Sequence, residues 1–163
     1  MRIDEILARK RTLSFEVFPP KKGAEERDKL FATIDELKEL SPDFISVTYG
    51  AGGSDSKNSV GIADYIQNRA GLTALAHITG GPSSPEDVDA VASALRDKGV
   101  ENVLCLRGDR PANYEAEYCR YFPHATDLAA YLAPYHFTLG AACYPEGHME
   151  CESLYADLVN MKK

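Results

Sequence analysis

The sequence of 163 residues is 44% hydrophobic and carries a formal net charge of −7, which is typical of one globular domain with a real core and argues against disorder. The acidic balance, with no Lys/Arg run longer than a pair, excludes nucleic acid and anionic membranes as main partners. The four cysteines form no CxxC pair and the opening MRIDEILARK has no apolar signal segment, so we expect a cytoplasmic protein with reduced thiols and no membrane span.

Apolar residues along the chain switch between a period of two, typical of strands, and a period of 3.6, typical of helices. In chain order the pattern predicts a strand at 12–18, a helix at 25–40, a strand at 43–48, a helix at 57–69, a strand at 72–78, a helix at 85–98, a strand at 102–106, a helix around 128–135, a strand at 137–143 and a helix from residue 150 onward. Such alternation is typical of parallel βα units with right-handed crossovers. The sequence therefore predicts an α/β protein with about five units.

The helix after the third strand has the clearest boundaries. Ser84 is placed to cap its N-terminus, Pro85 takes the first helical position, and Gly99 follows its last turn. Its helical spacing predicts a core-facing stripe of Val88, Val91, Ala92 and Leu95. By the same reasoning we expect the last helix to turn inward Leu154, Leu158 and Met161.

Two architectures fit five βα units. A doubly wound sheet of flavodoxin type would be complete at this length, whereas an eight-fold βα barrel needs about 250 residues and would be represented here by its first five units. Strand alternation helps to choose between them, because a doubly wound sheet is covered by helices on both faces and favours apolar residues on both.

Alternation predicts one mixed face and one apolar face. We assign to the mixed face Ser14, Glu16, Ser46, Thr48, Thr73, His77, Cys105 and Arg107. We assign to the apolar, helix-packed face Leu13, Phe15, Val17, Ile45, Val47, Leu104 and Leu106. A mixed face suits the interior of a barrel near its mouth, so the pattern favours the (β/α)8 TIM-barrel type, present as an open, partial barrel within a single domain, 1–163.

Each predicted strand ends in polar or glycine-rich residues. In chain order these are Glu16; Thr48, Tyr49 and Gly50; His77 and Thr79; Arg107, Gly108 and Asp109; and Tyr144, Glu146 and His148. The carboxyl ends of parallel strands lie on one rim, where α/β proteins build their active sites. The sequence therefore predicts a functional site at this rim.

Several of these residues also have purely structural interpretations. Glu16 could form an ion pair with Arg107, and His77 could be a hydrogen-bonded core histidine. Asp157 and Asn160 lie three residues apart, where solvated side chains of a polar helix face are common.

Other motifs carry weak signals. The segment GAGGS at 50–54 has neither phosphate-loop spacing, so a plain loop is as good an interpretation as a phosphate cradle. The RGD tripeptide at 107–109 is in the wrong setting for cell adhesion. Cys143, His148 and Cys151 lack a fourth metal ligand at a recognisable spacing, and we predict no metal site.

Six segments together resemble one family in their order and approximate spacing: SFEVFPPK, FISVTYGAGGS, AHIT, NVLCLRGDRP, CYPEGH and ADLVNMKK. The family is methylenetetrahydrofolate reductase, a flavin enzyme of one-carbon metabolism. The resemblance covers nearly the whole chain and implies a βα barrel that binds FAD and takes electrons from NADH or NADPH, with other donors in some bacterial relatives. It also implies a folate substrate, methionine biosynthesis as the setting and a homo-oligomer as one option.

The resemblance assigns roles to single residues. It makes Glu16 the general acid that protonates the folate nitrogen whose release opens the five-membered ring to an iminium. A general acid must hold its proton near neutral pH, and we expect burial of Glu16 in an apolar strand to favour that form. Asp109 matches an aspartate beside the flavin, where its negative charge would disfavour an anionic reduced flavin and improve hydride donation.

The flavin-contacting set implied by the resemblance comes from several strand ends and the last helix. It comprises Thr48, Tyr49, Ala51, His77, Arg107, Gly108, Asp109, Ala125, Tyr144, His148, Asp157, Asn160 and Lys163.

The family barrel continues for roughly three more βα units, so we expect this chain to be an incomplete form of the enzyme. Two alternatives stay open: a non-catalytic flavin- or folate-binding remnant or half of a two-chain assembly, and an independent doubly wound nucleotide-binding module.

Overall fold

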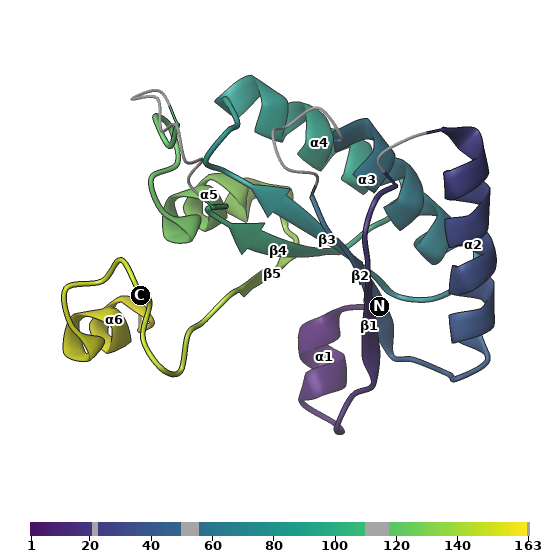
Figure 1. The fold of residues 1–163 in the computed structure, drawn as a ribbon, viewed down its shortest axis with the longest axis horizontal. Coiled ribbons are helices and arrows are strands. Elements are labelled where there is room, and N and C mark those ends of the chain that lie inside the picture. The colour runs from purple at the N-terminus through teal and green to yellow at the C-terminus, as the bar shows by residue number, and fades with distance from the viewer. Residues whose placement is uncertain (21–22, 50–55, 110–117, 163) are drawn as a thin grey trace.

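The computed structural model describes residues 1–20, 23–49, 56–109 and 118–162. Its centre is a sheet of five parallel strands in the order β1-β2-β3-β4-β5 (Figure 1), with bounds β1 Ser14–Val17, β2 Phe44–Val47, β3 Ala74–Thr79, β4 Asn102–Leu106 and β5 Thr138–Ala141. Each strand is added beside its predecessor on the same side, as in the wall of a βα barrel, and the order never reverses as it does in a doubly wound sheet. The partial-barrel prediction is confirmed, and the doubly wound alternative is wrong.

Helices follow the strands as predicted, with small shifts at their ends. Their bounds are α1 Ile3–Leu7, α2 Ala24–Lys38, α3 Ser56–Asp64, the π-helical turn η1 Tyr65–Arg69, α4 Pro85–Asp97, α5 Ala125–Leu132, the 3₁₀ turn η2 Ala133–Tyr135 and α6 Leu154–Asn160. The sequence analysis did not predict α1. In the described part of the chain, no helix has both the length and the apolar character needed to cross a membrane.

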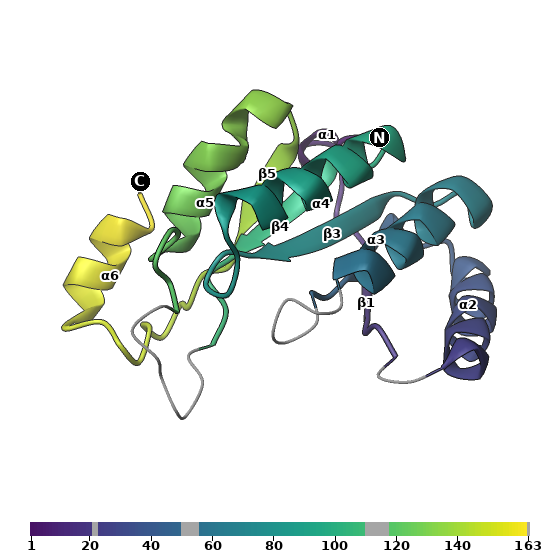
Figure 2. The same cartoon turned by 90° about the horizontal axis from the view of Figure 1, so that it is seen from above.

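One face of the sheet packs against α2 to α5, which form an arc along it (Figures 1 and 2). Alternate strand residues on this face are fully buried, among them Ile45, Val47, Ala76, Ile78 and Val103. The helices contribute to the same core the side chains of Ile34, Ile62, Val88, Leu128 and Leu132. Each such Val, Leu or Ile stabilises the fold by about 1.5 to 3 kcal/mol, so this helix-covered face holds the sheet together.

Helix α4 begins where its sequence predicted. The Asp87 backbone N–H donates to Ser84 Oγ at 3.2 Å and the Ser84 N–H donates to Asp87 Oδ2 at 3.0 Å, which completes a capping box. Gly99, with φ of +69°, follows the last turn in the left-handed region. The predicted stripe is buried against the core: Val88, Val91, Ala92 and Leu95.

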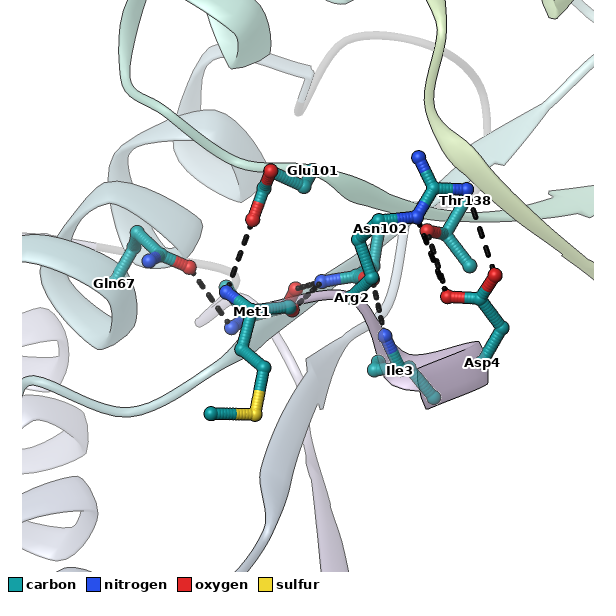
Figure 3. Close-up of polar contacts among 9 residues, drawn as sticks. Met1, Arg2, Ile3, Asp4, Gln67, Glu101, Asn102 and Thr138 are labelled. Atoms are coloured by element: carbon teal, nitrogen blue, oxygen red, sulfur yellow. Dashed lines mark hydrogen bonds and ion pairs between the residues drawn. The ribbon is translucent and has the colours of Figure 1, made fainter. Parts of the chain in front are cut away.

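The opposite face of the sheet carries α1 at the amino ends of the strands. Asn102, only 1% exposed, holds this segment: its Oδ1 accepts from the Ile3 N–H at 2.8 Å, and its Nδ2 donates to the carbonyls of Met1 and Ala74 at 3.1 and 3.2 Å (Figure 3). The Met1 ammonium lies 3.0 Å from Glu101 Oε2. Because Asn102 has partners for both its carbonyl oxygen and its amide, the buried amide links the N-terminal helix to the sheet.

Helix α6 lies apart from the sheet (Figures 1 and 2), and none of its residues is buried. The expected inward stripe is therefore wrong: the exposed fractions of Leu154 and Leu158 are 53% and 46%, and that of Met161, just after the helix, is 49%. A helical period in the sequence reports which residues share a face, but it does not report what packs on that face.

Strand register decides which residues share the open face, by which we mean the face opposite α2 to α5. Glu16 is the register partner of Ser46, and Ser46 that of Leu75, so His77 lies on this face too. The residues of β4 lie on the opposite faces of the sheet to those that we predicted. Leu104 pairs with His77 and Leu106 with Thr79 on the open face, whereas Cys105 pairs with Ile78 on the helix-covered face.

Candidate functional site

Three polar side chains meet on the open face at the carboxyl ends of β1, β2 and β3. Glu16 Oε2 lies 3.3 Å from Ser46 Oγ, which donates to it, and 3.6 Å from His77 Nε2. Glu16 and Ser46 are close because they are register partners on β1 and β2. His77 is close to Glu16 because it lies on the same face of the sheet. We call Glu16, Ser46 and His77 the acid cluster.

Glu16 differs from two of our predictions. Its side chain is 48% exposed rather than buried, because β1 is an edge strand of this sheet and Glu16 lies on the open face. Its partners are Ser46 and His77, so the alternative of a structural ion pair with Arg107 is wrong. An accessible carboxyl group with two fixed neighbours is suited to exchange a proton with a small molecule.

His77 is buried, with 6% of its surface exposed, and its Nε2 has no hydrogen-bond partner among the described residues. Burial lowers the pKa of His77 below its usual value because the charged imidazolium loses hydration, while the nearby Glu16 carboxylate acts in the opposite direction. The interpretation as a hydrogen-bonded core histidine therefore does not hold for Nε2. A buried polar atom left without a hydrogen bond is rare and costly, and a catalytic role is one of the reasons for which proteins keep one.

Arg107 belongs to a second cluster, beyond the carboxyl end of β4. Its Nη1 donates to Glu150 Oε2 at 2.7 Å and its Nη2 to Oε1 at 3.3 Å, an arrangement in which both carboxylate oxygens are held. This hydrogen bonding raises the pKa of Arg107 above its usual value, against the opposing effect of burial. The result is a fixed, half-buried cation at the rim.

The segment that leads into α6 is tied to that helix. The His148 ring packs edge-on against Tyr144 with centroids 4.8 Å apart, and the His148 N–H donates to Asp157 Oδ2 at 2.8 Å. Asp157 thus fixes the segment to α6, and the solvated-side-chain interpretation is wrong for this residue. Asn160 is the last residue of α6 and is exposed.

The loops after β3 and β4 pack closely together. The Gly81 N–H donates to the Arg107 carbonyl at 2.8 Å, and Tyr118 Oη donates to the Asp109 carbonyl at 2.8 Å. Gly108 has φ of +87°, and a Cβ there would collide with Thr79. These contacts hold the Arg107-Gly108-Asp109 backbone in place while the Asp109 side chain is exposed.

The remaining predicted site residues have other surroundings. The Thr48 carbonyl accepts from Ser59 Oγ at 3.0 Å, Tyr49 packs partly against the core, and Ala125 is the first residue of α5. Ala51 and Lys163 lie outside the described residues. Among the residues that the structure describes, no three His, Cys, Asp or Glu side chains come together in a way that could hold a metal ion.

Sequence reasoning missed three contributors to these clusters: Ser46, Glu150 and Tyr118. Strand alternation did indicate the direction of the Ser46 side chain, because it put Ser46 and Thr48 on the same mixed face as Glu16. Glu150 and Tyr118 lie in loops, where no periodicity predicts the direction of a side chain.

Comparison with known proteins adds independent findings. The family model for methylenetetrahydrofolate reductase matches residues 2–163. The chain is 35% identical over 152 residues to the 5,10-methylenetetrahydrofolate reductase of Escherichia coli K12, with 93% of this chain and 50% of that protein covered.

Two further relatives agree. The 5,10-methylenetetrahydrofolate reductase of Pectobacterium carotovorum is 36% identical over 151 residues, with 92% and 49% covered. A rice protein named probable methylenetetrahydrofolate reductase (NADH) is 35% identical over 153 residues, with 90% and 26% covered. The chain therefore spans about half the length of the bacterial relatives it matches.

Proposed function

This chain belongs to the methylenetetrahydrofolate reductase family, and from this premise we propose that it supplies the catalytic face of an FAD-dependent reductase that converts 5,10-methylenetetrahydrofolate to 5-methyltetrahydrofolate. NADH or NADPH is the proposed electron donor. The proposal extends to a single domain over 1–163, a cytoplasmic setting and a homo-oligomer.

The observation that carries the proposal is the position of Glu16. It is an acid on the open face, half exposed, and it lies beside a buried histidine whose Nε2 has no hydrogen-bond partner among the described residues. In the proposed reaction Glu16 gives its proton to the ring nitrogen of the folate that leaves the bridging carbon. The five-membered ring then opens to an iminium that can accept hydride.

The residues at the strand ends fit FAD by their chemistry. Arg107 offers guanidinium N–H donors while its charge is balanced by Glu150, Thr48 and Asn160 offer polar groups, and the Tyr144–His148 pair offers aromatic surface. Residues proposed to hold the cofactor are Thr48, Tyr49, Ala51, His77, Arg107, Gly108, Asp109, Ala125, Tyr144, His148, Asp157, Asn160 and Lys163. When bound, FAD would supply the hydride. The exposed Asp109 carboxylate would add negative charge at its edge.

The test separates the two half-reactions. It uses this chain and a version extended to the length of its bacterial relatives, each mixed with FAD, and measures flavin binding by absorbance. Glu16→Gln in the extended version should leave flavin reduction by NADH or NADPH unchanged and reduce folate turnover by about 10²-fold or more. Near-wild-type folate turnover in this variant would rule out the general-acid role.

A second function is separated by the same experiment. If the extended version binds FAD but oxidises no reductant in a single turnover, a non-catalytic flavin- or folate-binding role replaces the reductase. Glu25→Gln changes an exposed residue on α2 that pairs with Lys29 on the same helix; it is the matched control and should leave both half-reactions unchanged.

A further inference from the structure

The acid cluster contains two neighbours of Glu16 whose arrangement suggests more than packing. Ser46 and His77 are 6% exposed each, they come from different strands, and both approach the same atom, Glu16 Oε2. The hydrogen bond and the ion pair that Glu16 makes with the described residues both involve Oε2 and not Oε1. One oxygen of the carboxyl group is thus held by the protein, and the other is left for solvent or a ligand.

We propose that Ser46 and His77 are positioning residues for Glu16, which fix its carboxyl group on the open face, and that the Glu16 carboxylate is in turn coupled to the imidazole by favouring its protonated form. This inference rests on the proposed function for its catalytic meaning, but the coupling itself is a property of residues 1–163. It concerns a single proton, which moves between Glu16 Oε2 and the lone pair of His77 Nε2 without any other reactant.

Ser46 can serve both protonation states of Glu16. Its hydroxyl has one hydrogen and two acceptors within reach, Glu16 Oε2 at 3.3 Å and the Phe15 carbonyl at 3.5 Å. When Glu16 is ionised, the hydroxyl donates to the carboxylate. When Glu16 is protonated, the hydroxyl can turn to Phe15 and accept from Glu16 instead. In either state the Ser46 hydroxyl has an acceptor for its hydrogen, which suits a neighbour of a residue that gains and loses a proton in each turnover.

His77 supplies the second contact. A protonated Glu16 can donate to the neutral Nε2, which has no other partner among the described residues. An ionised Glu16 instead stabilises the imidazolium across 3.6 Å. The Glu16 carboxylate therefore favours the charged form of His77, against the effect of burial.

The surroundings of His77 leave Glu16 as its electrostatic partner. The register partner on β4 is Leu104, and β2 contributes Ser46 to the same face, and neither residue carries a charge. In the described part of the chain, Glu16 is the charged group that acts on His77.

The test is a histidine titration of residues 1–163 by NMR, in which each of the four imidazoles is assigned by substitution. Glu16→Gln removes the negative charge with little change in shape, so the midpoint of His77 should fall by about one pH unit. Glu16→Asp keeps the charge and should retain part of the effect. The midpoints of His124 and His136, both exposed, should stay unchanged and report that the fold is intact.

An unchanged or higher midpoint of His77 in Glu16→Gln, with the other histidines unaltered, would overturn the coupling.

Catalytic positioning has its own readout in the extended version: Ser46→Ala should slow folate reduction about tenfold at unchanged flavin reduction, and Ser46→Thr should restore it. Equal rates in Ser46→Ala and wild type would overturn the role of Ser46. Because the titration needs no turnover, it can show the coupling even if Glu16 is not the general acid. A failure of the coupling is therefore distinguishable from a failure of the proposed function.

Discussion

The two faces of the sheet are built from alternate residues of the same strands and serve different purposes. On the helix-covered face, Ile45, Ile78 and Val103 are completely buried among side chains from α2 to α5. On the open face, Glu16, Ser46 and His77 form a polar cluster. A β-strand can therefore separate stability from chemistry at a spacing of one residue, because successive side chains point to opposite sides.

Asn102 qualifies this division. It lies on the open face, in register with Leu75 and Thr138, yet it is buried and holds the N-terminal segment. The open face thus has a structural end beneath α1 and a polar end at the carboxyl rim. Four predictions test this comparison, from the largest expected effect to the smallest.

The helix-covered face should be the most sensitive to truncation. Ile78→Ala removes a side chain with 0% exposure and should lower the free energy of unfolding by about 2 to 5 kcal/mol, since a cavity remains. Urea denaturation followed by circular dichroism measures it. The control on the open face is Leu106→Ala, only partly buried, which should cost clearly less. Equal losses would contradict the division between the faces.

The buried amide beneath α1 should come next. Asn102→Leu preserves volume but leaves the Ile3 N–H and the Met1 and Ala74 carbonyls without their partner, so we expect a loss of about 1 to 3 kcal/mol. Hydrogen exchange of the Ile3 amide should speed up. Thr138→Val, which removes only a 3.4 Å contact with Asp4, is the control and should have little effect. A neutral Asn102→Leu would mean that α1 is not stabilised through this residue.

Helix caps allow a matched comparison of the core with the region outside it. Ser84 and Ser153 both accept a backbone N–H at 3.2 Å, from Asp87 and Ala156 respectively. Ser84→Ala should cost about 1 kcal/mol, because α4 is part of the core. Ser153→Ala should leave global unfolding unchanged, because α6 has no buried residue. Equal effects in the two denaturation curves would show that α6 unfolds together with the sheet.

The smallest effect concerns pH. The pKa of His77 is lowered in the folded protein by burial, so as the pH falls below about 6.5 the unfolded chain binds a proton that the folded chain does not. Stability should therefore decrease from that pH downward until folded His77 itself takes up a proton. His77→Gln should flatten this part of the stability curve, whereas His136→Gln, at an exposed position, should not. Identical slopes in all three proteins would contradict the assignment.

Much of the fold followed from local patterns. The capping residues Ser84 and Pro85 and the stripe of α4 were predictable because they depend on residues within four positions of each other. The phase of β4 was not, because every residue of the run Val103 to Leu106 is apolar and alternation gives no preference for either face. Helix α1 was missed because five residues are too short for a helical period to be recognised.

The candidate site was predictable in its location but not in its contacts. Polar residues at strand ends indicated the rim, and the resemblance gave Glu16 a role. The sequence suggested Arg107 as a structural partner of Glu16, but the actual partners depend on strand register and on the paths of the loops. Arg107 instead binds Glu150, a residue for which the sequence offered no signal.

The amino-acid sequence by itself determined the family, the succession of strands and helices and the best-marked helix, because these depend on ordered motifs and on neighbours along the chain. Only the tertiary structure decided that Glu16 is half exposed and shares Oε2 with Ser46 and His77. It also decided that the apolar stripe of α6 is uncovered. These features depend on contacts between segments far apart in the chain, and the register of the parallel strands fixes the first of them.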